Sequence, residues 1–245
     1  MRIPPLYVCV TAAIVTLGAS AAATSLFTDD FSTMISGGCY ADGQTVGGWL
    51  SVYDGYGCNS TAVQNGNPML SEQPLASTAP NETHAGLAVG PATSGDVDLA
   101  VSLLTARQLR SGSLPNAWEV GWVLWNYSDN THFYYFVPKP NGWELGKEDP
   151  AYPGAQRFLA TGSSPQFPIG QWYRVRIAQS GSTIRVYVND LLITTFTDQE
   201  RAYYAGRVGL YNEDSQVYFD DVSATWSGSV SPSPTPAPVK KGHRK

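Results

Sequence analysis

The segment "QWYRVRIAQSGSTIRVYVND" (Gln171–Asp190) decides the fold class of this chain. On both sides of Ser180-Gly181, apolar and polar residues alternate with the two-residue period of a β-strand. A Ser-Gly pair between two such runs is a turn signal. The segment therefore predicts two antiparallel strands joined by a tight turn.

Runs of the same kind extend from this hairpin toward both ends of the chain, and no segment shows a helical period. The alternation in Asp96–Leu109 favours a strand, and Asn141-Gly142 is a strong turn signal between two further runs. The other predicted strands lie in 117–127, 131–137, 143–147, 191–196, 206–213 and 216–225. The chain is therefore predicted to be all-β, an antiparallel β-sandwich or jelly roll.

The order of these strand motifs resembles a known superfamily. "WYRVRIAQSGSTIRVYVNDLLITTFTD" (Trp172–Asp198) and "GRVGLYNEDSQVYFDDVSAT" (Gly206–Thr225) resemble the C-terminal half of concanavalin A-like, laminin-G-like jelly rolls. "GWVLWNYSDNTHFYYF" (Gly121–Phe136) resembles their middle hairpin, and "LFTDDF" (Leu26–Phe31) resembles their opening strand. The chain looks nearest to secreted bacterial proteins described as family 16-like or 3-keto-disaccharide hydrolase-like.

This resemblance implies a concanavalin A-like jelly roll with a glycan ligand on a concave sheet, and often a bound calcium ion. The superfamily includes lectins, glycoside hydrolases, polysaccharide lyases and adhesion modules, so the fold alone does not define the activity. Laminarinase-type members carry a Glu-x-Asp-x-x-Glu strand, and this chain has no such motif. Trp125 stands where the middle hairpin usually has Arg.

The two ends of the chain differ in composition from the predicted domain, 24–226. Residues 1–23 combine Arg2, an apolar run and a small-residue stretch, "ASAAA", which predicts a cleaved secretory signal; a retained anchor is the alternative. We expect a secreted protein without a membrane span in its mature form. Residues 227–245 are rich in Pro and end with four cations, which predicts a solvated, disordered tail. Association with anionic cell-wall polymers is the alternative role of this tail.

Net charge limits the classes of partner that we expect, and the cysteine content predicts a disulfide. Without Arg2 and the four tail cations, 10 of the 15 Lys and Arg residues remain, against all 20 Asp and Glu residues. The net charge of the predicted domain is therefore about −10. We therefore expect no nucleic-acid partner. Cys9 lies in the predicted signal, which leaves Cys39 and Cys58 as a disulfide pair in an exported chain. We expect a monomer.

Aromatic residues gather in the middle of the sequence, and sugar sites use aromatic rings as platforms. Strict alternation places Trp118, Trp122 and Asn126 on one face of the first middle strand. Glu119, Val123, Trp125 and Tyr127 then share the other face. We expect that second face to be the open one, with Trp125, Tyr127 and Trp143 as platforms for a polysaccharide or oligosaccharide.

The residues present allow two reaction types, hydrolysis and elimination. Hydrolysis needs two facing carboxylates, for which Glu119 and Glu144 are the preferred candidates; the others are Glu148, Asp149, Glu213 and Asp214. Elimination from a uronate needs a base and a cation, for which we name His132 or Tyr134 with Lys147 and Arg174. Motifs of serine hydrolases, P-loops and His-based zinc sites do not occur.

Pairs of adjacent Asp residues stand in the first and last predicted strands. If Phe219 points into the core, alternation also points Asp221 inward, where a lone carboxylate is unfavourable. The resemblance implies that the two strands lie side by side. Asp29, Asp30 and Asp221, with Asp54 from a glycine-rich loop, then form a predicted structural calcium site. The alternative is that both pairs only hydrogen-bond to turns or solvent.

The sequence thus predicts a secreted carbohydrate-active domain that binds and cleaves a polysaccharide or oligosaccharide, as a glycoside hydrolase does. The alternatives are a binding module without catalysis and a polysaccharide lyase.

Overall fold

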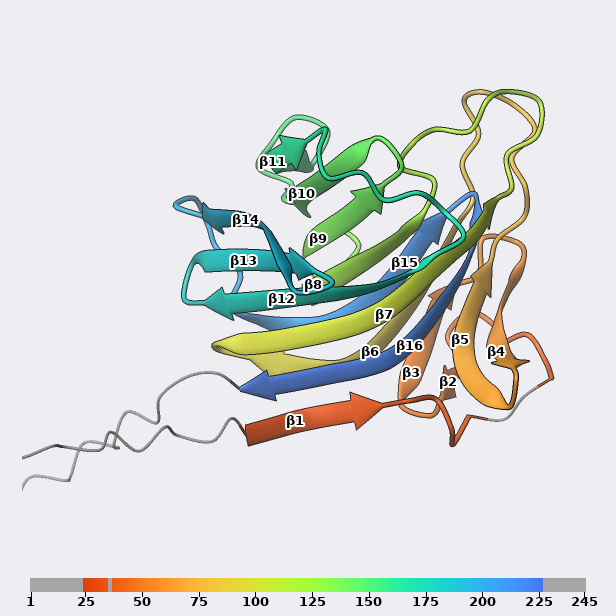
Figure 1. Ribbon diagram of the computed structural model, residues 1–245, viewed down its shortest axis with the longest axis horizontal. Coiled ribbons are helices and arrows are strands. Elements are labelled where there is room, and N and C mark those ends of the chain that lie inside the picture. The colour runs from red at the N-terminus through yellow and green to blue at the C-terminus, as the bar shows by residue number, and fades with distance from the viewer. Residues whose placement is uncertain (1–23, 35–36, 227–245) are drawn as a thin grey trace, which may run out of the picture.

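The computed structural model describes residues 24–34 and 37–226, and these form sixteen β-strands and no helix. The strands are arranged in two antiparallel sheets that pack face to face (Figure 1). We call them sheet A and sheet B, and we call the face that each turns to the other its inner face. The predicted signal, 1–23, and the predicted tail, 227–245, lie outside the described residues. No helix within the described ranges is long and apolar enough to cross a membrane.

Sheet A is built around the long strands β7 and β16. Its order is β14 (Leu191–Thr197), β13 (Thr183–Val188), β12 (Trp172–Ser180), β7 (Val97–Gln108), β16 (Ser215–Trp226), β5 (Asn67–Gln73) and β4 (Cys58–Gln64). The opening strand β1 (Thr24–Asp29) pairs with β16, as the resemblance implied.

Sheet B holds the middle of the sequence. Its order is β11 (Gln156–Gly162), β10 (Gly142–Glu148), β9 (His132–Lys139), β8 (Gly121–Asp129), β15 (Ala205–Glu213), β6 (Ala85–Ser94), β3 (Trp49–Tyr53) and β2 (Thr45–Val46). The hairpins predicted from the alternating runs are confirmed, with strand ends shifted by a few residues. The two central hairpins, β8–β9–β10, place the aromatic-rich stretch in the middle of this sheet.

The core lies between the inner faces. From sheet A it contains the alternating residues of β7 that the sequence indicated, such as Leu99 and Val101, both fully buried. From sheet B it contains Trp125, Tyr134 and Leu145. Burying aliphatic and aromatic side chains from both sheets is the main favourable term for a sandwich of this kind.

Two β-bulges change which face the later residues of a strand occupy. In β8, Asn126 has a positive φ of 51°, so Trp125 points into the core and Tyr127 to the outer face. In β16, Asp221 has a φ of 48°, so the inward positions are Phe219 and Val222 while Asp221 is exposed. Strict alternation therefore predicted both Tyr127 and Asp221 on the wrong face, because each bulge inserts one extra residue.

Candidate functional site

The outer face of sheet B carries a second cluster of buried apolar side chains. Its largest members are aromatic rings that lie across the strands and touch one another. The Trp122 ring centroid lies 5.0 Å from that of Tyr135 and 5.1 Å from that of Tyr211. We call this cluster the aromatic layer; its members are Tyr53, Leu87, Val89, Trp122, Leu124, Tyr127, Phe133, Tyr135, Val137 and Tyr211.

One glycine allows this layer to lie flat. An added Cβ on Gly146 would come within 2.2 Å of the Tyr135 hydroxyl oxygen. The Tyr135 ring therefore crosses β10 at a position where any side chain would displace it. Burial raises the pKa of the Tyr135 phenol further, so its hydroxyl keeps its proton and remains a hydrogen-bond donor.

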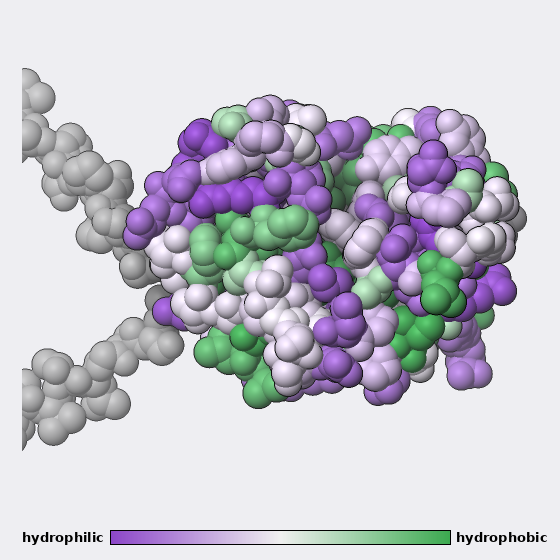
Figure 2. Space-filling view, turned by 90° about the horizontal axis from the view of Figure 1, so that it is seen from above, coloured by the Kyte–Doolittle hydropathy of each residue, from purple (hydrophilic) through white to green (hydrophobic). Residues whose placement is uncertain are grey.

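At one side of the aromatic layer lies a pocket of about 300 Å³, which we call the Glu144 pocket. Its lining residues are Trp118, Trp122, Glu144, Gln156, Phe158 and Glu213. The Trp118 side chain is 44% exposed and that of Phe158 58% exposed, so both rings are accessible to a ligand. Seen from above, the described surface is largely hydrophilic or neutral with separate apolar patches (Figure 2).

Glu144 lies on the outer face of β10 with both carboxylate oxygens bonded. Its Oε1 accepts a hydrogen bond from the Tyr135 hydroxyl at 2.9 Å, and its Oε2 accepts one from Lys139 Nζ at 2.9 Å. Gln156 Nε2 donates in turn to the Tyr135 hydroxyl at 2.9 Å. Two donors, one of them a cation, suit a carboxylate that is ionised and fixed in position.

Glu213, at the end of β15, has a different environment in the same pocket. Burial raises its pKa to about 7; a hydrogen bond from Tyr211 opposes the shift, and the carboxylates of Asp214, Glu119 and Glu144 add to it. Glu213 has no cation within ion-pair distance in the described part of the chain. Glu144, held by a cation, and Glu213, with its raised pKa, therefore line one pocket as a candidate acid–base pair.

Glu119 is not a member of this pair. Its side chain is fully buried, and its Oε1 accepts a hydrogen bond from Arg110 Nε at 2.6 Å. Arg110 Nη2 also lies 3.0 Å from Asp214 Oδ2 and donates to a backbone carbonyl, that of Glu82, at 2.8 Å. Glu119 and Glu144, the two carboxylates preferred from the sequence, do not lie on neighbouring strands, because Glu119 precedes β8 and the whole of β9 separates β8 from β10.

This buried ion cluster still affects the site. Glu119 follows Trp118 directly, and Asp214 follows Glu213. Arg110 therefore ties together the chain segments that carry two lining residues of the Glu144 pocket, Trp118 and Glu213. Losing one partner of such a buried cluster would leave uncompensated charge, which strongly favours keeping the three together.

Four of the predicted site residues lie in the core between the sheets. Trp125 and Tyr134 are fully buried and stack on each other, with ring centroids 5.3 Å apart. Lys147 is fully buried and bonded to Asp198 at 2.8 Å. Trp143 is 8% exposed and belongs to the same core. The expectation of an open face with Trp125 is therefore wrong, because that face is the inner face of sheet B.

The remaining candidates for catalysis and binding lie apart from the Glu144 pocket. Tyr127 belongs to the aromatic layer but is 8% exposed, and its hydroxyl donates to Asn130. His132 lies at the β8–β9 turn and pairs with Asp129 at 2.9 Å. Arg174 lies on sheet A, where it donates to Ser102 and Ser223. His132, Tyr134, Lys147 and Arg174 thus do not form one elimination site.

The predicted calcium ligands are only partly brought together. Asp29, Asp30 and Asp221 line one pocket beside the β1–β16 pair, and Asp54 lines a different pocket. Both oxygens of Asp29 accept protein hydrogen bonds, and the Arg174 guanidinium shares the pocket with Asp221. The four-carboxylate set is therefore not brought together, because Asp54 lies in the other pocket, and no three acidic, His or Cys side chains among the described residues are grouped closely enough to hold a metal ion. Calcium binding by the other three remains a prediction.

Sequence reasoning missed most of the residues that line the Glu144 pocket. Trp118 and Trp122 were placed on one face correctly, but that face was taken to be the core. Glu213 was one of several candidate acids. The signal available in the sequence was Tyr211, which stands two residues earlier and therefore on the same face of β15. Gln156 and Phe158 had no signal, because nothing in the sequence shows that β11 pairs with β10.

Comparisons with known proteins agree with this fold. A family model described as a 3-keto-alpha-glucoside-1,2-lyase-like domain matches residues 40–225. No curated protein sequence matches the chain. Among solved structures, a carbohydrate binding module from Bacillus subtilis, CBM66, is 14% identical, with a TM-score of 0.53, and the match covers 73% of this chain and 95% of that one.

Two further structures are similar at comparable levels. The family GH16 endo-β-1,3(4)-glucanase SCLam is 11% identical, with a TM-score of 0.51 and coverage of 86% of this chain and 94% of that one. A Bacillus subtilis protein of unknown function with a galectin-like fold is 11% identical, with a TM-score of 0.51 and coverage of 78% and 97%. At these identities the likeness shows a shared fold, which confirms the predicted concanavalin A-like jelly roll.

Proposed function

Since the chain belongs to the family of 3-keto-alpha-glucoside-1,2-lyase-like domains, we propose that it binds an oligosaccharide in the Glu144 pocket and cleaves a glycosidic bond there. The observation that carries this proposal is the combination of two carboxyl groups in different environments with the exposed rings of Trp118 and Phe158. The rings present apolar faces for stacking against a sugar, and the carboxyl groups supply the acid and the base.

The two carboxyl groups have distinct roles in this proposal. Glu213 acts as the acid: it donates its proton to the glycosidic oxygen as the bond from that oxygen to the sugar carbon breaks. Glu144 acts as the base: in hydrolysis it takes a proton from the water that adds to the same carbon. Lys139 and Tyr135 hold Glu144 in place, and Gln156 is in reach of the Tyr135 hydroxyl and the pocket.

The family description favours elimination as the second candidate reaction. There Glu144 removes a proton from the carbon next to the one that bears the leaving oxygen. The leaving oxygen takes the proton of Glu213, and a double bond forms between the two carbons. A keto group on the sugar would make the removed proton more acidic, and such a group is named in the description of the family. The pocket contains an acid and a base for either reaction.

A binding module without catalysis is the rival from another class. The similarity to a carbohydrate binding module makes this outcome concrete: the same rings would hold a sugar, and the carboxylates would only accept hydrogen bonds from its hydroxyl groups. We also propose that the protein works outside the cell, which is supported by its disulfide, since such bonds persist in oxidising compartments.

A panel of neutral oligosaccharides and their 3-keto derivatives tests the proposal. Product release is followed by mass spectrometry, which separates addition of water from elimination. We expect Glu213→Gln and Glu144→Gln each to lower kcat about 100-fold or more with little change in binding, and Trp118→Ala to weaken binding. Asp190→Asn, at an exposed carboxylate in the β13–β14 turn of sheet A, is the matched control and should change neither.

The pH dependence identifies the acid. Glu213 must be protonated, so activity should fall as the pH rises above about 7, and Glu213→Gln should remove this limb of the profile from its residual activity. Binding that depends on Trp118 without any cleavage would assign the domain to the binding class. If no member of the panel binds or reacts, the proposed function is wrong.

A further inference from the structure

We propose that a second sugar-binding pocket lies beside the first, at the turn that follows β3, and that the ligand is therefore a neutral oligosaccharide long enough to reach both. This inference rests on the proposed function of the Glu144 pocket. The second pocket has a volume of about 350 Å³. We call it the Tyr56 pocket; its lining residues are Asp42, Tyr53, Asp54, Gly55, Tyr56, Thr83, His84 and Ala85.

Tyr56 is presented to solvent in an unusual backbone conformation. Its side chain is 84% exposed, yet its φ is 61°, a region that residues with a side chain rarely adopt. The Tyr56 amide donates to Asp54 Oδ1 at 2.9 Å, which holds the turn. The ring contacts His84 edge-on, with centroids 5.6 Å apart. Strained backbone around an exposed ring points to a function for the ring, because packing does not require it.

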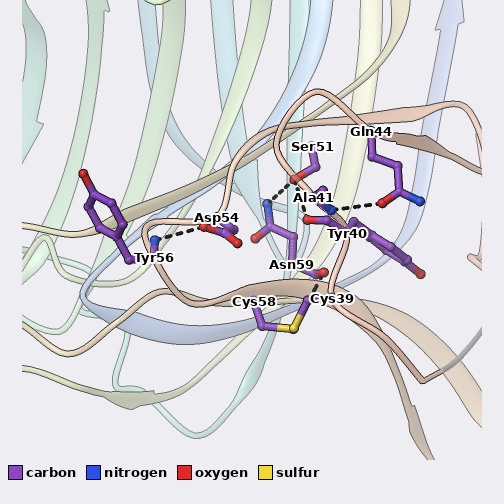
Figure 3. The surroundings of a disulfide bond; sticks show 9 residues. All are labelled: Cys39, Tyr40, Ala41, Gln44, Ser51, Asp54, Tyr56, Cys58 and Asn59. Atoms are coloured by element: carbon purple, nitrogen blue, oxygen red, sulfur yellow. Dashed lines mark hydrogen bonds between the residues drawn. A yellow bond between two sulfur atoms is a disulfide. The ribbon is translucent and has the colours of Figure 1, made fainter.

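The turn that carries Tyr56 is held close to the disulfide on its C-terminal side (Figure 3). An added Cβ on Gly57 would lie 2.1 Å from the Gln73 carbonyl oxygen, so this glycine packs directly on the chain that follows β5. Cys58, the next residue, is bonded to Cys39. In Figure 3 the Tyr56 ring points away from this disulfide. A ring on a turn fixed in this way loses little conformational entropy when a ligand stacks on it.

Polar groups around Tyr56 suit hydroxyl groups rather than anions. Asp42 Oδ1 accepts the Asp54 amide at 3.0 Å, and Asp54 Oδ1 accepts the Tyr56 amide. Each carboxylate has a second oxygen that can accept a hydroxyl hydrogen bond from a ligand. No Lys or Arg lines the pocket among the described residues. Two carboxylates without a Lys or Arg beside them would repel a uronate or a sulfated sugar, and His84, the other titratable group of the lining, is paired with Glu82, so the ligand class is neutral.

The two pockets lie on the same side of sheet B. Tyr53 lines the Tyr56 pocket and also belongs to the aromatic layer that holds Trp122 of the Glu144 pocket. Only β6 separates β3 from β15, the strand of Glu213. Two interstrand spacings amount to about 10 Å, a gap that a sugar chain can bridge across the aromatic layer. The ligand then runs across the strands from Phe158 toward Tyr56.

Ladders of neutral gluco-oligosaccharides, from disaccharides to octasaccharides with 1,2, 1,3 or 1,4 linkages, test this inference by calorimetry on the full chain. We expect affinity to rise with length. Tyr56→Ala should weaken the longest ligands about tenfold and leave disaccharides unchanged, whereas Trp118→Ala should weaken both. Tyr204→Ala, at a ring that is 52% exposed elsewhere, is the matched control, and melting temperatures check that each variant folds.

Each outcome separates this inference from the proposed function. If Trp118→Ala weakens binding and Tyr56→Ala changes nothing at any length, the second pocket is not a sugar site and the first one stands. If Tyr56→Ala weakens disaccharides as strongly as octasaccharides, there are not two subsites and the inference is overturned. If the protein binds none of the ladders, or neither variant has an effect, this inference fails, whereas the proposed function fails only if the 3-keto derivatives of its own panel neither bind nor react.

Discussion

Glu72 is a carboxyl group without a charged partner in the interior of the sandwich. Its side chain is fully buried on β5, and no Lys, Arg or His pairs with it among the described residues. Burial raises its pKa well above the ordinary value of 4.5, and the nearby Ala88 backbone amide opposes the shift. In the folded protein Glu72 therefore holds its proton at pH values where the unfolded chain has lost it.

This proton makes stability depend on pH. Above about pH 4.5 the unfolded state binds fewer protons at Glu72 than the folded state does, so the free energy of unfolding falls as the pH rises, until the folded group also ionises. Glu72→Gln removes this contribution, so its melting temperature should fall less than that of the wild type between pH 5 and pH 8. Equal slopes for the two proteins would show that Glu72 does not titrate in this way.

Single residues also show where sequence reasoning stops. Glu144 was named from the sequence as a catalytic candidate and does line the pocket on sheet B. Glu119 looked equivalent in the sequence, but Arg110 binds it in the interior. No local pattern distinguishes the two acids, because the second carboxylate partner of Arg110, Asp214, is 104 positions away along the chain. A buried ion cluster of this kind can be recognised only from the tertiary structure.

At the scale of elements, the alternation of apolar and polar residues predicted the strands well. It predicted the face on which each side chain lies only as far as the first β-bulge of the strand. The run in β7 keeps one phase from Val97 to Thr105, and its apolar positions Val97, Leu99, Val101 and Leu103 are in the core as expected. In β8 and β16 the phase changes at Asn126 and at Asp221, which have positive φ. Asn and Asp adopt this conformation more readily than most residues, but the sequence does not show which of them does so.

The bulge in β16 can be tested through its backbone. At Asp221 a glycine adopts positive φ without strain, whereas a β-branched side chain does so only at a cost of about 1–2 kcal/mol. We therefore expect Asp221→Val to lower the free energy of unfolding by about 1–2 kcal/mol relative to Asp221→Gly, measured by urea denaturation. Asp221→Asn, which removes the charge and tolerates the conformation, is the control. A valine variant as stable as the asparagine variant would contradict the left-handed bulge.

At the scale of the whole molecule, a disulfide lies near the Tyr56 pocket and holds the segment before β2 against β4 of sheet A. The disulfide Cys39–Cys58, predicted from the cysteine count, closes a loop with a separation of 19 residues and ties the segment before β2 to β4. Constraining the unfolded chain by a loop of this length contributes about 3 kcal/mol. The Cys39→Ala/Cys58→Ala variant should therefore unfold at a clearly lower urea concentration, with the same circular dichroism spectrum before the transition. An unchanged midpoint would show that the link adds no stability.

The calcium prediction also belongs to this scale, because it concerns the junction of the first and last strands. If Asp29, Asp30 and Asp221 bind the ion, millimolar calcium raises the melting temperature, a chelator reverses the rise, and Asp221→Asn removes it. Asp54→Asn serves as the control, since Asp54 lines the other pocket. A wild-type melting temperature that neither calcium nor chelator moves rules the ion out at this place.

The pairing of β1 with β16 has a consequence for how this domain can be built into other proteins. Thr24 lies opposite Trp226, so the two ends of the sandwich leave it side by side (Figure 1). A short peptide can join them, and the chain can then be reopened at an exposed turn such as Asn189-Asp190 to give a circular permutant. Because its two ends are adjacent, the sandwich can also be inserted into a surface loop of a host protein without separating the two ends of that loop. Both proposed sugar pockets lie beside sheet B, whereas this junction lies on sheet A, so such a graft leaves them open.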